Sequence, residues 1–180
     1  GYEGKTIGEI SKTLNVPPLE FVLDLLYEED CKVSVIFFNM SEENLARILK
    51  WDSVMIGSDS SLRSLEGVLN YGKPHPRGYG TFSRVIRKYV NETSILSIEE
   101  AIYKMTGFPA QTLGLKDRGI LKEGFFADIT IFDQETIAEQ ATFTSPHNYS
   151  TGIKHVLVNG KLTINDGKHE SVTNGAILKK

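Results

Sequence analysis

A carboxylate follows directly after an apolar run that is typical of a buried strand. Residues 53–58 read Ser-Val-Met-Ile-Gly-Ser, and Asp59 comes next. In parallel α/β sheets the reactive residues gather at the carboxyl ends of the strands. A carboxylate in that place can bind a metal ion or take a proton from a metal-bound water. The alternative is that Asp59 only caps the following turn, because Ser-Asp-Ser-Ser is common turn chemistry.

A second group of candidate residues lies in the loop Lys73-Pro-His-Pro-Arg-Gly-Tyr-Gly. Its prolines stiffen the backbone, and its glycines let the backbone approach a ligand closely. Arg77 has a planar guanidinium that fits a carboxylate through two parallel hydrogen bonds, although it suits a structural acid equally well. His75 could be a base or a ligand, but a lone histidine between prolines is more often a structural hydrogen-bonding group.

The remaining residues that could do chemistry form no known catalytic motif. His147, His155 and His169 have no metal-ligand spacing, and the sequence contains no His-x-His, His-Glu-x-x-His, Gly-x-Ser-x-Gly or phosphate-binding loop. The single cysteine, Cys31, excludes an internal disulfide and a cysteine-based zinc module. We expect Cys31 to be an inert, partly buried thiol.

Composition narrows the class of protein. The 180 residues are 40% hydrophobic and 24% charged, with a net charge of −3, which gives no electrostatic reason to expect a nucleic acid or an anionic membrane as partner. No apolar run approaches the roughly 18 to 20 residues that span a bilayer. The chain opens Gly-Tyr-Glu-Gly-Lys, which is neither an initiator methionine nor a signal peptide. We therefore expect a cytoplasmic protein that is either processed or part of a longer chain.

The elements that must position these residues alternate between helix and strand. Helices are predicted over 6–13, from Pro18, and over 42–50, 82–91, 97–106 and 109–113, and strands over 33–40, 53–58, 127–132, 155–158 and 161–164. Asn159-Gly160 predicts a tight hairpin turn between the last two strands. The first two strands have the nearly unbroken apolar pattern of parallel strands, and two such strands cannot close a barrel. The pattern indicates the last quarter of a larger α/β domain over residues 1–115, followed by a small β-rich part over residues 116–180.

In this order the motifs resemble the C-terminal part of the D-aminoacylases, the N-acyl-D-amino-acid deacylases of the amidohydrolase superfamily. The stretches that carry the resemblance are Ile56-Gly-Ser-Asp-Ser, His75-Pro-Arg-Gly-Tyr-Gly-Thr-Phe, Pro109-Ala-Gln-Thr-Leu-Gly-Leu through Gly124-Phe-Phe-Ala-Asp-Ile-Thr-Ile-Phe-Asp, and Val156-Leu-Val-Asn-Gly-Lys. The third and fourth occur across amidohydrolases. The first two, taken together, point to the D-aminoacylase branch.

The resemblance implies a (β/α)8 barrel flanked by a small β-sandwich, and zinc-assisted hydrolysis of an N-acyl-D-amino acid. It makes Asp59 the aspartate at the end of the eighth barrel strand, which lies at the metal centre, activates the attacking water and passes the proton to the leaving amine. It makes Arg77 the arginine that holds the carboxylate of the substrate. His75 and Tyr79 belong to the same motif and are predicted to line the substrate site, without an assigned role.

The family's other metal ligands (a His-x-His, a cysteine and two later histidines) and its substrate-binding lysine have no counterpart in these residues. Cys31 does not match the family's cysteine, which comes far earlier in the barrel. We therefore expect the chain to be a C-terminal segment that is inactive and has no tight zinc site by itself. Its expected partners are the small-molecule substrate and either the rest of the barrel or a second copy of the chain.

Two other interpretations stay open. The chain could belong to another amidohydrolase, such as a hydantoinase or dihydroorotase relative, although the His-Pro-Arg motif argues against this. It could also be a non-catalytic module that self-associates through exposed strand edges, since unpaired edges favour association.

Overall fold

The first helix begins where Thr6 caps it. In the computed structural model, which describes residues 1–178, helix α1 spans Ile7–Leu14 and helix α2 spans Pro18–Glu28. The Thr6 hydroxyl accepts a hydrogen bond from the Glu9 amide, and the Glu9 carboxylate accepts one from the Thr6 amide, so the two residues form a complete capping box. Both predicted helices are confirmed.

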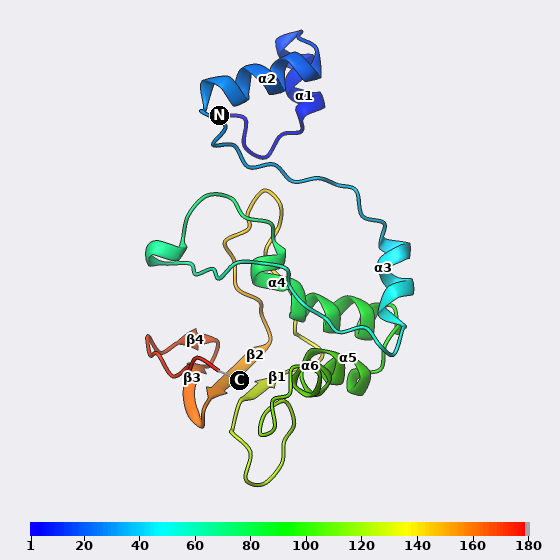
Figure 1. Ribbon diagram of the computed structural model, residues 1–180, viewed down its shortest axis with the longest axis vertical. Coiled ribbons are helices and arrows are strands. Elements are labelled where there is room, and N and C mark those ends of the chain that lie inside the picture. Colours follow the sequence, from blue (N-terminus) through cyan, green and yellow to red (C-terminus); the bar gives the residue numbers. More distant parts are fainter. Residues whose placement is uncertain (179–180) are drawn as a thin grey trace. The chain divides into compact units, whose positions relative to one another are not determined.

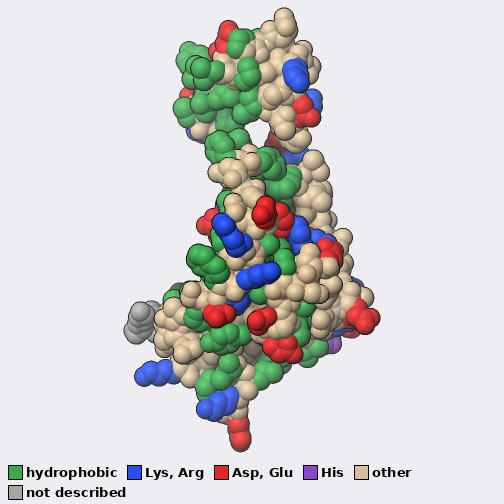
Figure 2. Space-filling model, turned by 90° about the vertical axis from the view of Figure 1, so that its right-hand side faces the viewer, with side chains coloured by type: hydrophobic (Ala, Val, Ile, Leu, Met, Phe, Trp, Pro, Cys, Tyr) green, Lys and Arg blue, Asp and Glu red, His purple; other side chains and the backbone are tan. Residues whose placement is uncertain are grey.

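These helices belong to the first of two compact units, which covers Gly1–Asn39. Ile10 and Phe21 are buried between them, and the Tyr2 ring meets the Phe21 ring edge-on at 5.2 Å. Figure 2 shows hydrophobic side chains gathered on the surface of this unit, and Leu19 and Tyr27 are among the exposed ones. A unit of this size has too little interior to bury a broad apolar helix face.

Helices make up most of the first half of the second unit, which begins at Met40 (Figure 1). They are α3 (Glu42–Leu49), a 3-10 turn η1 (Gly67–Leu69), α4 (Arg77–Arg84), a π-helical continuation η2 (Val85–Glu92), α5 (Ile98–Met105) and α6 (Gly107–Thr112). Ser41 caps α3, and Ser97 forms a capping box with Glu100 at the start of α5. The core joins α3, η2 and α5 through Leu49, Val85, Tyr89, Leu96 and Ala101.

The second half of this unit carries one antiparallel sheet. Its strands β1 (Ile129–Phe132), β2 (Ile153–Val158), β3 (Lys161–Asn165) and β4 (Lys168–His169) lie in chain order. The turn between β2 and β3 has positive φ at both Asn159 (51°) and Gly160 (75°), the backbone that an Asn-Gly hairpin turn requires. The three strands predicted after residue 126 and the hairpin turn between the last two are therefore confirmed. Within residues 1–178, no helix has the length and apolar character needed to cross a bilayer.

Two predicted strands are wrong for this structure. Residues 33–40 and 53–58 form no strand, and several apolar side chains of the first segment, including Val35 and Phe37, are exposed. A parallel strand exists only where a neighbouring strand takes up its N–H and C=O groups, and the described residues supply no such neighbour to either segment. Cys31, expected to be partly buried, is exposed. The helix predicted over 82–91 begins five residues earlier, at Arg77.

Candidate active site

The extended segment before Asp59 is held by α5. The Ile56 amide donates a hydrogen bond to the Lys104 carbonyl at 3.1 Å, and the Ile56 side chain packs against the core. The Lys104 side chain is buried, and its ammonium donates to the carbonyls of Trp51 and Val54. The segment therefore has a fixed path although it belongs to no sheet. Sequence reasoning missed this role of Lys104, because a lysine on a helix is most often a solvated charge.

At the end of this segment Asp59 turns the chain in the left-handed region, with φ 48°. Its carboxylate is 89% exposed and pairs with the Arg77 guanidinium, with Oδ2 and Nη2 3.0 Å apart. The structure thus brings together the two residues predicted to carry the chemistry, which stand in different loops. An ion pair this exposed contributes only about 0 to 1 kcal/mol. Either partner can therefore exchange the other for a ligand at little cost.

Arg77 is the first residue of α4, and the glycine-rich sequence after it is helical rather than a loop. Gly80 explains why a helix with two glycines forms here. A Cβ on Gly80 would come within 2.6 Å of the Glu139 Cβ, so only glycine lets the helix lie this close to that residue. Docking against Glu139 compensates for the low helix propensity that misled the sequence prediction.

His75 lies just before α4 and contacts its first residue. Its Nδ1 accepts a hydrogen bond from the Arg77 amide at 3.0 Å, and its ring meets the Phe143 ring edge-on at 5.0 Å. Burial lowers the pKa of His75 below its usual value, and the positive charge of Arg77 adds to the effect. The imidazole is therefore neutral at pH 7.

Tyr79 ties α4 to two other segments. Its hydroxyl donates to the Ser64 carbonyl at 2.9 Å, and its ring lies near the rings of His147 and Tyr149. Burial raises the pKa of Tyr79, and Tyr149 raises it further, so the phenol stays protonated at neutral pH. The contacts of His75 and Tyr79 are with the protein itself, and their predicted contact with substrate stays a prediction.

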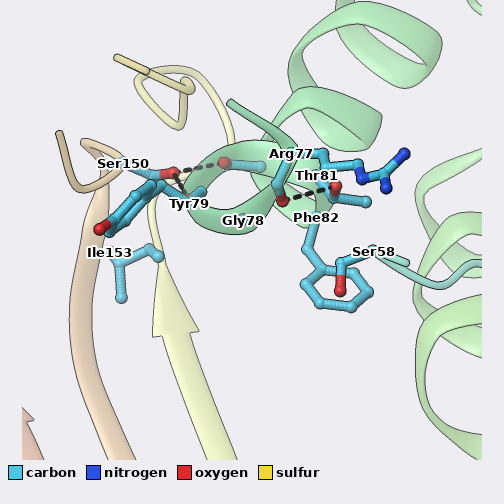
Figure 3. A pocket seen from close by; sticks show the side chains of 9 residues that line it. Ser58, Arg77, Gly78, Tyr79, Thr81, Phe82, Ser150 and Ile153 are labelled. Atoms are coloured by element: carbon cyan, nitrogen blue, oxygen red, sulfur yellow. Dashed lines mark hydrogen bonds between the residues drawn. The ribbon is translucent and has the colours of Figure 1, made fainter. Parts of the chain in front are cut away.

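A small pocket opens beside this helix (Figure 3). It has a volume of about 160 Å³, below the 300 to 1,000 Å³ usual for a small-molecule site, so it can hold part of a ligand. On one wall the Ser150 hydroxyl donates to the Tyr79 carbonyl at 3.1 Å and shares a hydrogen bond with Ser83. The lining residues are Ser58, Arg77, Gly78, Tyr79, Thr81, Phe82, Ser83, Ser150 and Ile153.

An ion-pair network that sequence reasoning missed anchors the far end of α4. The Glu139 carboxylate, 12% exposed, accepts hydrogen bonds from Arg84 Nη1 at 3.1 Å and Arg87 Nε at 2.7 Å, and a third from Arg87 Nη2. Burial alone would raise the pKa of Glu139, but the hydrogen bonds and charges of the two arginines outweigh it and hold the pKa below its usual value. The pairing spans 52 residues in the case of Arg87, and no local pattern indicates it.

Zinc does not fit the described residues by themselves. A structural or catalytic zinc site takes at least three protein ligands. Within residues 1–178 no three histidine, cysteine, aspartate or glutamate side chains come together in a group that could hold a metal ion. Asp59 is a single carboxylate whose observed partner is Arg77.

Comparison with known proteins decides the family. The sequence model of the "Amidohydrolase family" matches residues 52–164, which include Asp59, Arg77 and the β-rich part. The chain belongs to the amidohydrolase family. It is 43% identical over 130 residues to an N-acyl-D-glutamate deacylase of Alcaligenes xylosoxydans xylosoxydans, a match that covers 72% of this chain and 25% of that protein. It is 42% identical over 125 residues to a D-aminoacylase of the same organism, covering 69% of this chain and 24% of that protein.

Solved structures agree with this placement of the amidohydrolase chain. A crystal structure of D-aminoacylase superposes with a TM-score of 0.81 at 32% identity, covering 97% of this chain and 34% of the other. The N-acyl-D-glutamate deacylase from Bordetella bronchiseptica, complexed with zinc and a phosphonate inhibitor, superposes with a TM-score of 0.76 at 32% identity, covering 96% and 35%. The chain therefore spans about a quarter of the length of the curated relatives and about a third of the solved structures.

Dihydroorotases also match the amidohydrolase chain, over a shorter stretch. The one from Endomicrobium trichonymphae is 41% identical over 58 residues, or 32% of this chain and 14% of that protein. The longer matches are to deacylases, and they agree with the branch that the His-Pro-Arg motif indicates.

Proposed function

We propose that these residues form part of the active site of a metal-dependent N-acyl-D-amino-acid deacylase. The observation that carries the proposal is the contact between Asp59 and Arg77, whose charged atoms lie 3.0 Å apart. In an N-acyl amino acid, a single carbon separates the scissile amide nitrogen from the carboxylate. A general base and a carboxylate-binding arginine that serve this substrate must therefore be neighbours.

In this proposal Arg77 holds the substrate carboxylate through its guanidinium, displacing Asp59 from the exposed ion pair. Asp59 then takes a proton from the water that attacks the acyl carbon. The same carboxyl group returns the proton to the amide nitrogen as the carbon–nitrogen bond breaks, and the products are a carboxylic acid and a D-amino acid. Each proton transfer by a positioned side chain contributes about 10² to 10⁴ in rate.

We further propose that the complete protein uses zinc, with Asp59 the one ligand supplied by these residues and the others supplied by parts of the protein outside them. The support for this is that the Bordetella deacylase holds zinc, and that a D-aminoacylase that superposes with a TM-score of 0.82 has a binuclear metal centre. Zinc takes mostly histidine, cysteine and carboxylate ligands, and Asp59 can be one of them. The 180 residues alone are then expected to show no turnover and no stoichiometric zinc.

The experiment assays the complete protein encoded by the gene with N-acetyl-D-methionine and N-acetyl-D-glutamate. The matching L-enantiomers and dihydroorotate are the controls. We expect hydrolysis of the D-compounds, a fall in kcat of about 10³-fold for Asp59→Asn, and mainly a rise in KM for Arg77→Gln. A substrate whose carboxylate is replaced by a carboxamide should be little affected by Arg77→Gln. Hydrolysis of dihydroorotate alone, or equal rates for D- and L-compounds, would refute the proposal.

A further inference from the structure

The first turn of α4 has an unusual cap. The first N–H groups of a helix have no partner inside the helix, and a side chain of the capping residue commonly accepts from them. Here the capping residue is Pro76, whose side chain accepts no hydrogen bond. The Arg77 amide donates instead to His75 Nδ1 at 3.0 Å, and the Gly78 amide donates to the His75 carbonyl at 3.1 Å. His75 thus satisfies two of these donors.

The surroundings hold the imidazole in one chemical form. Because Nδ1 accepts a hydrogen bond from a backbone N–H, Nδ1 carries no proton, and the neutral ring carries its proton on Nε2. The ring is clamped edge-on by Phe143, and prolines on both sides of His75 stiffen the backbone. The direction of the pKa shift of His75, downward, agrees with this neutral form.

We infer that His75 is a positioning residue, which fixes the backbone of Arg77 so that the guanidinium of Arg77 meets the substrate carboxylate. This inference deepens the proposed function and rests on it. The bond that His75 makes is the same i to i+2 contact that an asparagine or aspartate makes with its own backbone in an Asx turn. Asparagine at position 75 should therefore replace the acceptor, although it cannot replace the ring.

The role of His75 Nδ1 as hydrogen-bond acceptor can be tested in the 180-residue chain by measurements that do not require enzymatic activity. Nitrogen-15 spectra of the imidazole groups should show His75 with an unprotonated Nδ1 and a protonated Nε2. The Arg77 amide should exchange its hydrogen roughly tenfold faster in His75→Phe than in the wild type, and near the wild-type rate in His75→Asn. His169 is a matched control, because its Nδ1 accepts from the Ser171 amide at 3.0 Å on an exposed strand end, and His169→Phe should leave Arg77 exchange unchanged. A proton on His75 Nδ1 would overturn the inference.

The effect on the substrate is tested in the complete protein with the same three variants. His75→Phe keeps a ring against Phe143 but has no acceptor, and we expect it to raise KM for an N-acyl-D-amino acid roughly tenfold while kcat changes less than about threefold. His75→Asn should restore KM, and the carboxamide substrate should not distinguish the variants. If His75→Asn is as impaired as His75→Phe, restoring the acceptor does not restore the position of Arg77, and the inference is wrong. A wild type without deacylase activity would refute only the proposed function, and the spectra and exchange rates would then decide the inference.

Discussion

Glu139 offers a sharp test of how α4 is held. Its carboxylate accepts three hydrogen bonds from Arg84 and Arg87 and is 12% exposed, while the side chains of the two arginines are 38% and 30% exposed. Glu139→Gln keeps the volume of the side chain, removes its charge and puts an amide donor among guanidinium donors. The substitution therefore changes the electrostatics of the network and leaves its packing nearly intact.

The expected loss follows from these exposures. Removing one partner of a fully buried ion pair costs about 3 to 5 kcal/mol, whereas an exposed pair contributes about 0 to 1 kcal/mol. Since the carboxylate is nearly buried and the guanidinium groups reach solvent, we expect the free energy of unfolding of the second unit to fall by about 2 kcal/mol. At a typical urea dependence of about 2 kcal/mol per molar, the midpoint should move down by about 1 M.

Urea unfolding of the 180-residue chain, followed by tryptophan fluorescence, measures this loss. Trp51 is the single tryptophan and lies in the same unit as Glu139, so its signal reports the relevant transition. The matched control is Glu92→Gln, because Glu92 also pairs with Arg87 but its side chain is 48% exposed, and its loss should be about 0.5 kcal/mol or less. Equal urea midpoints for the two variants would refute the idea that burial makes Glu139 contribute more than Glu92 to the free energy of unfolding.

Three further predictions concern the packing of Gly80 in α4, the packing of Gly8 in α1 and the charge of Glu139. Gly80→Ala should destabilise α4 by about 1 kcal/mol, since overpacking against Glu139 costs about 1 to 3 kcal/mol and alanine returns about 1 kcal/mol of helix propensity. A Cβ at Gly8 in α1 would meet no atom within 4 Å, so Gly8→Ala should stabilise that helix by about 0.5 to 1 kcal/mol. Hydrogen exchange of the amides in α1 and α4 measures the sign of both effects. The lowered pKa of Glu139 means that its contribution is complete above the unfolded pKa of about 4.5 and is lost as the pH falls through the lower folded value. Acid titration of the urea midpoint should therefore be shallower in Glu139→Gln than in the wild type, and parallel curves would contradict this.

Local signals in the sequence predicted local structure well. The starts of the helices near Thr6 and Ser97 and the Asn159-Gly160 turn were predicted correctly, because each depends on residues that lie within a few positions of one another. The strands over 33–40 and 53–58 were predicted wrongly, because a strand needs a partner that the sequence of the strand does not specify. The start of α4 was placed too late for a related reason. Its glycines favour a loop by local propensity, and only the packing of α4 against Glu139 explains why they are helical.

The candidate site shows the same difference between local signals, which the sequence carries, and contacts between distant segments, which it does not. Asp59 and Arg77 became candidates through their residue types and their places after an apolar run and in a stiffened loop, and the resemblance to the D-aminoacylases gave each a predicted role. The ion pair between them was not predicted, since neither segment contains a signal that specifies the other as its partner. The residues that hold them, such as Lys104 and Glu139, gave no signal, because a buried charge is recognised only from partners that lie about 50 residues away.

These contacts show that residues after position 115 help to hold α4 and His75. The segment between β1 and β2 runs beside α4 in Figure 1, and it supplies the Glu139 carboxylate, the Phe143 ring and the Ser150 hydroxyl that hold the helix and His75. The predicted boundary between residues 115 and 116 would assign these groups to a different domain from Arg77. If the substrate carboxylate is bound by Arg77, its affinity depends on residues on both sides of that boundary. Variation in the segment between β1 and β2 is then a way to change substrate binding without touching Asp59 or Arg77.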